Sequence, residues 1–153
     1  MPSNLIPFLV IVPVIDLSIA TYFVYSTHAA WRSAPPFENE EKTDERSLGA
    51  TVILAQLGAV ITGSSIILAG IAAFVALAGA AIGEFEKFYI LYAAIWAVFA
   101  MAISLFTMST LPHRTTTQNF VKSHGVAILC SAALYFCLAS SARFLFAVGS
   151  ILF

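Results

Sequence analysis

The sequence predicts an all-α fold, a bundle of four transmembrane helices in a membrane. Two observations on composition lead to this prediction. Of the 153 residues, 60% are hydrophobic and only 10% are charged, and the mean hydropathy is +0.93. A soluble domain is about half apolar and about a quarter charged, so the composition excludes a water-soluble globule. The net charge of −1 offers no electrostatic footprint for nucleic acid.

The third observation is that four stretches are almost free of charge. The predicted spans cover residues 5–27, 49–77, 88–111 and 124–150. Each is longer than the roughly 20 residues that a helix needs to cross the hydrocarbon core, and none alternates with the period of a barrel strand. Between the first two spans lies an acidic, solvated connector, residues 32–47. We therefore expect a single transmembrane domain over residues 1–153.

The first span is predicted to be a retained helix. No Lys or Arg precedes Leu5, so the cationic segment that begins a signal peptide is missing. The apolar run Leu5–Ser26 is also longer than the roughly 7–15 residues of a signal-peptide core.

The second span is longer than a membrane requires. Leu48–Gly83 contains no charged residue, and as one helix it would extend about 54 Å at about 1.5 Å per residue. Two interpretations follow. One continuous helix tilts or protrudes, or the chain breaks near Gly70 or Gly79, as helices do at the binding sites of some transporters.

The distribution of cationic residues predicts the topology. The first and third connectors carry five of the six Lys and Arg residues found in connectors, and the second carries one: Arg32, Lys42, Arg46, Arg114 and Lys122 against Lys87. The positive-inside rule therefore places the first and third connectors in the cytoplasm. Both termini are then expected on the non-cytoplasmic side.

The second span carries a stripe of mostly small residues. Gln56, Ala59, Gly63, Gly70 and Ala73 recur at helical spacing and share one face. Small residues let membrane helices approach closely and gain dispersion contacts. The stripe is predicted to pack against the other three helices, and a self-association interface is the alternative.

Asp16 and Arg143 are the only formal charges inside the predicted spans. An ionisable group at membrane depth costs roughly 2.5–3.5 kcal/mol and usually has a partner. Asp16 lies 12 residues from Asn4 and Arg143 lies 10 residues from Phe153, so their depths of about 18 Å and 15 Å agree within one helical turn. We predict an Asp16–Arg143 ion pair between neighbouring first and fourth helices.

Three roles remain open for these two charges. The pair can be a clamp that fixes the register of two helices. Asp16 can instead belong to a proton or ion relay, because Pro13 frees the backbone carbonyl one turn earlier. In the third interpretation, Arg143 pairs with a lipid phosphate or another subunit.

Two histidines are expected at the same membrane interface. His28 ends the first span and His124 begins the fourth. Polar residues belong at span ends, so we predict interfacial histidines and no cofactor. A metal or haem held by His28 and His124 is the alternative, because imidazoles ligate both.

The predicted function is that of a non-catalytic structural or accessory subunit packed into a larger membrane complex. The sequence lacks recognisable catalytic motifs, so it gives little support to an enzyme. The expected partners are the lipid bilayer and other membrane subunits. The alternative is a homo-oligomeric transporter, channel or pore with Asp16 near the ion or proton path.

Overall fold

The computed structural model describes residues 6–33, 43–115 and 124–152, with side chains described for 11–26, 29, 50–79, 81–110 and 125–151. Within this part of the chain the structure is helical. The four long helices are α1 (Ile6–Ser33), α2 (Thr43–Ala78), α3 (Glu84–Thr115) and α4 (His124–Leu152). The prediction of an all-α fold is confirmed.

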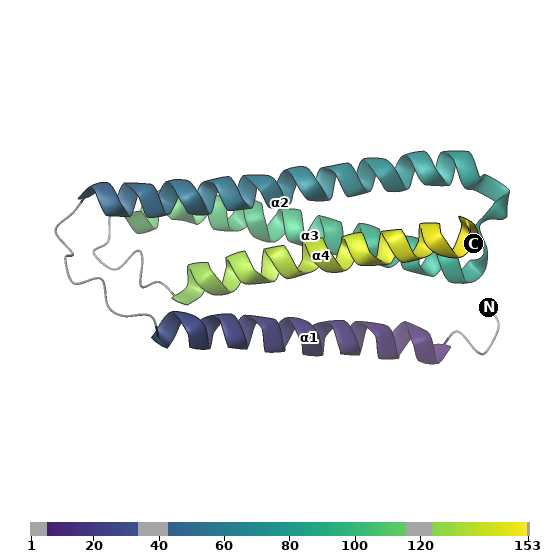
Figure 1. The fold of residues 1–153 in the computed structure, drawn as a ribbon, viewed down its shortest axis with the longest axis horizontal. Helices are drawn as coiled ribbons and strands as arrows, with labels where there is room; N and C mark the ends of the chain where they lie inside the picture. Colours follow the sequence, from purple (N-terminus) through teal and green to yellow (C-terminus); the bar gives the residue numbers. More distant parts are fainter. Residues whose placement is uncertain (1–5, 34–42, 116–123, 153) are drawn as a thin grey trace.

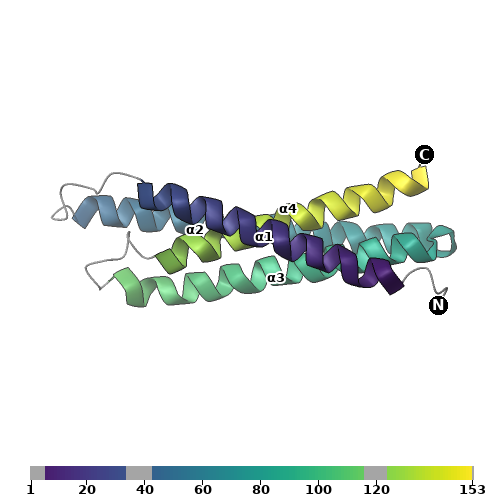
Figure 2. The ribbon, with the colours of Figure 1, turned by 90° about the horizontal axis from the view of Figure 1, so that it is seen from below.

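The four helices run side by side along one long axis (Figure 1). The start of α1 and the end of α4 lie at the same end of the bundle as the turn between α2 and α3. Among the described residues, α4 is the central element because it packs against α1, α2 and α3. Helix α1 crosses α4 at an angle (Figure 2), and α4 is its main neighbour.

Helix α2 is continuous and contains no break at Gly70. It runs from Thr43 to Ala78 and is followed by one turn of 3₁₀ helix, η2 (Gly79–Ala81). Gly79 has a φ of 38°, a left-handed conformation that costs a residue with a Cβ atom but not glycine. The chain then becomes extended at Ile82 and enters α3. The long charge-free stretch is therefore one helix plus the turn that reverses the chain.

The core is built where small residues let α3 and α4 approach closely. Ala93, Ala97 and Ala100 on α3 are fully buried, as is Ala133 on α4. Ser140 on α4 is also fully buried, and its Oγ donates to the backbone carbonyl of Ala93 at 2.6 Å. Close backbone approach and interhelical hydrogen bonds are what hold helices together in lipid.

Three helices are long and apolar enough to cross a membrane. The qualifying segments are Ala50–Ala78, Glu84–Thr110 and Gly125–Ile151. The described side chains of α1 add a shorter apolar segment, Ile11–Ser26. The length and composition of these segments are those of a membrane protein.

Candidate functional site

The two charges predicted to meet are brought together in the structure. Nη2 of Arg143 on α4 donates to Oδ2 of Asp16 on α1 and forms an ion pair with it. Only 7% of the Asp16 side chain and 12% of the Arg143 side chain are exposed. A buried charge of either sign is costly unless it is paired and hydrogen-bonded. The pair therefore removes a large penalty at the point where α1 crosses α4.

A third helix also reaches the Asp16 carboxylate. Nε1 of Trp96, which is buried on α3, donates to Oδ2 of Asp16 at 2.9 Å. The hydroxyl of Tyr135 on α4 donates to the backbone carbonyl oxygen of Asp16 at 3.0 Å. Asp16 thus accepts hydrogen bonds from α3 and α4 at once, and one residue ties α1 to both helices.

Aromatic rings surround the ion pair. The guanidinium carbon of Arg143 lies 5.8 Å from the centroid of the Tyr92 ring, within the range of a cation–π contact. The Trp96 ring stacks on Phe136 with centroids 4.8 Å apart. We refer to Asp16, Trp96, Tyr135 and Arg143 as the charged cluster.

The charged cluster joins three helices around one largely buried carboxylate. Oδ2 of Asp16 already faces two donors, the Arg143 guanidinium and the Trp96 indole. The Asp16 residue as a whole is only 5% exposed. A pocket of about 490 Å³ adjoins the ion pair and is lined by Asp16 and Arg143 together with apolar and aromatic side chains of α1, α3 and α4. Nε of Arg143 is buried and has no acceptor among the described residues.

The small-residue stripe on α2 is divided between two environments. A Cβ atom on Gly63 would lie 3.5 Å from Sγ of Cys137, and one on Gly70 would lie 3.1 Å from Phe144. Gly63 and Gly70 therefore lie against α4. Gln56, Ala59 and Ala73 are exposed in the single chain, and Gln56 and Ala59 line a groove beside α4.

The buried face of α2 lies next to the face that carries the predicted stripe of small residues. It is formed by Leu57, Val60, Ser64, Ile67 and Ile71, which are all buried. Of the five stripe residues, Gly63 and Gly70 lie against side chains of α4, and the packing of the other three stays a prediction. Gly63 and Gly70 lie where Cys137 and Phe144 approach α2, and large aliphatic side chains form most of the rest of its buried face.

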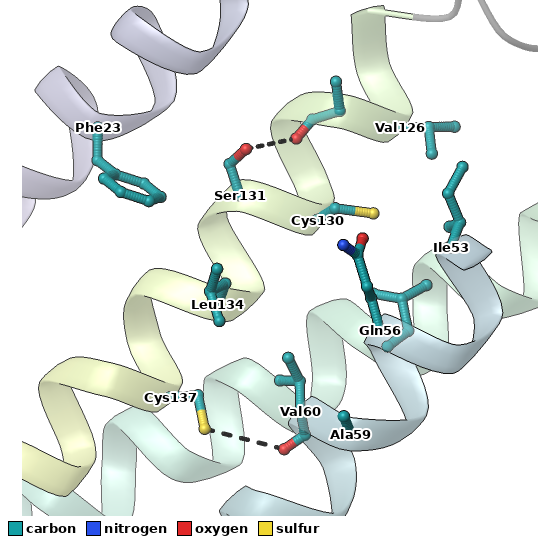
Figure 3. Close-up of a pocket in the computed structure, with 12 residues that line it drawn as sticks. Phe23, Ile53, Gln56, Ala59, Val60, Val126, Cys130, Ser131, Leu134 and Cys137 are labelled. Atoms are coloured by element: carbon teal, nitrogen blue, oxygen red, sulfur yellow. Dashed lines mark hydrogen bonds between the residues drawn. The ribbon is translucent and has the colours of Figure 1, made fainter. Parts of the chain in front are cut away.

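Another groove lies between α1, α2 and α4 (Figure 3). Its volume is about 500 Å³. Phe23 of α1 lies on one side and Gln56 of α2 on the other, and the Gln56 carboxamide points toward Cys130 of α4 (Figure 3). The remaining lining is almost entirely apolar and includes Ile53, Leu57, Val60, Val126 and Leu134.

The predicted histidine site lies outside the part of the structure that describes side chains. His28 is in the last turns of α1 and His124 is the first residue of α4, but neither side chain is described. Among the side chains that are described, no group of three or more His, Cys, Asp or Glu residues could hold a metal ion.

Sequence reasoning missed the contribution of α3 to the charged cluster. Trp96 is the only tryptophan inside a predicted span, and a buried indole N–H usually needs an acceptor. Asp16 offered the only carboxylate at membrane depth. That combination was a usable signal for the Trp96–Asp16 bond, whereas the contact of Tyr135 with a backbone carbonyl leaves no trace in the sequence.

Comparisons of the chain with protein-family models, with curated proteins and with solved structures found no match.

Proposed function

We propose that this chain is a non-catalytic structural or accessory subunit of a larger membrane complex. In this proposal all four helices cross the bilayer and both termini lie on the non-cytoplasmic side. Helix α1 has 28 residues, which gives a length of about 42 Å and exceeds the roughly 30 Å of the hydrocarbon core. Its attachment to α4 through the charged cluster supports its inclusion in the membrane-spanning bundle.

The observation that carries the proposal is the outward face of α2. Seven exposed residues follow one another there at alternating spacings of four and three, and all but one are small. They are Ala55, Ala59, Thr62, Ile66, Ala69, Ala73 and Ala76, and we call them the α2 seam. The seam extends about 31 Å along the helix, which matches the thickness of the hydrocarbon core.

The outward face of α3 provides an internal comparison. Its most exposed side chains are large and apolar, among them Leu91, Val98, Phe99, Leu105 and Phe106, each more than half exposed. Large apolar residues suit contact with lipid chains, whereas small residues are enriched where membrane helices meet one another. Helix α2 also exposes large apolar side chains, among them Val52, Val75 and Leu77. The contrast with α3 is therefore confined to the α2 seam, where it supports a protein partner.

The charged cluster supports a structural role for Asp16. Its carboxylate oxygen is engaged by Arg143 and Trp96, so the charge inside the bundle serves to hold α1, α3 and α4 in one arrangement. A fixed arrangement presents the α2 seam to a partner as a rigid surface, and rigid surfaces lose less conformational entropy on association.

The test is to measure the mass of the native particle extracted in mild detergent and the masses of its separated subunits. We expect other polypeptides in fixed ratio to this chain. The variant Ala69→Leu puts a larger side chain into the α2 seam and should release those partners. The matched control Ala102→Leu, on the exposed face of α3, should retain them.

A particle whose mass is a small multiple of 16.4 kDa would contradict the accessory-subunit proposal. It would favour the homo-oligomeric transporter, channel or pore, with the α2 seam joining identical copies. Retention of all partners by Ala69→Leu would also contradict the proposal, because the seam would then not be the contact surface.

A further inference from the structure

We propose that the groove between α1, α2 and α4 is a lipid-binding site that holds one acyl chain of a membrane glycerophospholipid, with Gln56 donating to its ester carbonyl. The groove shares only Ala59 with the α2 seam, and a lipid bound in it goes beyond the proposed role as a subunit because it does not require a protein partner.

The groove has the shape and the lining that suit a hydrocarbon chain. Along α4 the lining extends from Val126 to Cys137, about 16 Å of helix axis. The volume of about 500 Å³ is spread along that length, and most of the lining is apolar. An elongated apolar groove offers dispersion contacts along the whole length of an acyl chain.

The depth of the groove matches one leaflet of the bilayer. The span Gly125–Ile151 has 27 residues and is about 40 Å long, so a centred hydrocarbon core of about 30 Å begins about three residues after Gly125. Val126 then lies at the headgroup level. Cys137 lies about 13 Å inside the core, close to the midplane at about 15 Å. The groove thus runs from the headgroup region to the middle of the bilayer.

The polar group in the groove lies at the level of the lipid ester. The span Ala50–Ala78 has 29 residues, and the same arithmetic puts the edge of the core about four or five residues after Ala50. Gln56 is therefore within about one helical turn of that edge. Its carboxamide points into the groove (Figure 3), and no hydrogen bond to it is found among the described residues.

An unpaired amide facing hydrocarbon is costly. An ester carbonyl of a glycerophospholipid is an acceptor at that depth and carries an acyl chain that continues toward the midplane. The other polar atoms of the groove are largely occupied. Oγ of Ser131 donates to the backbone carbonyl of Ala127 at 2.8 Å, and Sγ of Cys137 lies 4.0 Å from the carbonyl oxygen of Val60. The Gln56 amide is thus the group left to recognise a ligand.

The test uses the full chain, purified in mild detergent, with dioleoyl phosphatidylcholine added and bound lipid counted by native mass spectrometry. We expect one phosphatidylcholine to be retained at collision energies that remove the detergent. Cys130→Phe fills the groove opposite Gln56 and should lower the retained fraction at least about tenfold. Gln56→Leu keeps the groove and removes the donor, and should lower retention about two- to tenfold.

The matched control is Ser150→Phe, a change of similar size at an exposed position of α4 outside the groove, which should retain lipid as the wild type does. Ala69→Leu, in the α2 seam, should also leave lipid retention unchanged. Conversely, Cys130→Phe should leave the mass of the native particle unchanged apart from the lipid. The lipid site and the accessory-subunit proposal can therefore fail independently.

A second measurement locates the lipid in vesicles of dioleoyl phosphatidylcholine that contain a photoactivatable phosphatidylcholine. A diazirine at the methyl end of the acyl chain should label α4 near Cys137, and one near the ester should label α2 near Gln56. Absence of retained lipid in the wild type would overturn the proposal. So would equal labelling of the groove and of the outward face of α3, or retention that is unchanged in both Cys130→Phe and Gln56→Leu.

Discussion

The ion pair between Asp16 and Arg143 allows the sharpest test of the bundle's energetics. Both side chains are largely enclosed, since only 7% and 12% of them are exposed. Removing one member of a buried pair leaves the other charge without compensation, which costs about 3–5 kcal/mol. Asp16→Asn still offers a carbonyl oxygen to the Trp96 indole, so its loss comes mainly from the ion pair. We expect Asp16→Asn and Arg143→Met each to lower the free energy of unfolding by about 3–4 kcal/mol.

The double variant separates pairing from general damage. In the variant that combines Asp16→Asn and Arg143→Met, no buried charge is left without a partner. The remaining loss of unfolding free energy comes from an amide that is incompletely hydrogen-bonded in place of the carboxylate, about 1–2 kcal/mol. The two single changes should therefore be strongly non-additive, with a coupling energy of at least about 2 kcal/mol. The measurement is reversible unfolding in mixed micelles with increasing sodium dodecyl sulfate, followed by far-UV circular dichroism.

The exposed pair of Glu84 and Lys87 serves as the control. These side chains are joined at 2.9 Å but are 66% and 58% exposed, and such surface pairs add little to stability. Glu84→Gln should therefore give an unfolding curve that overlaps that of the wild type. Additive effects of Asp16→Asn and Arg143→Met, with a coupling energy below about 0.5 kcal/mol, would refute the clamp.

Two further changes are tested by the same titration. Trp96→Phe keeps a ring beside Phe136 but removes the indole donor to Asp16. It should lower the free energy of unfolding by about 1–3 kcal/mol. An unchanged unfolding midpoint would mean that this hydrogen bond contributes nothing to stability. Gly79→Ala should cost about 1–2 kcal/mol because Gly79 has a φ of 38°. Gly149→Ala is the control, because Gly149 lies in helix α4 and the new methyl group would have equal space there. This change should be neutral or stabilising. Equal losses of unfolding free energy at both glycines would contradict the argument from backbone strain.

The sequence was sufficient to predict the parts of this molecule that depend on length, hydropathy and charge. Helices are the natural solution for long apolar stretches in lipid, because every backbone group must be bonded internally. Asp16 and Arg143 could be matched by depth, because the rise per residue is constant and few charges occur in the spans. These are one-dimensional properties, and counting residues is enough to find them.

The rotation of α2 could not be predicted in this way. Small residues occur on its inner side at Gly63 and Gly70 and on its outer side along the α2 seam. In a membrane both faces are apolar, so hydropathy does not distinguish the face that meets protein from the face that meets lipid. Which small residues lie inside depends on where Cys137 and Phe144 project from α4, and that is a property of three helices packed together.

The charged cluster and the groove have a common structural cause. The Asp16–Arg143 pair joins α1 to α4. Arg143 is eight residues from the Ile151 end of the apolar segment of α4, in the half of that segment away from the groove. On the groove side, Phe23 approaches Tyr135 with ring centroids 6.1 Å apart, while α2 packs against α3 and α4. Helix α1 is therefore held to α4 by an electrostatic contact in one half of the bundle, and the groove lies beside α2 in the other half. An empty groove forfeits dispersion contacts, and in the proposed lipid site an acyl chain of the membrane supplies them.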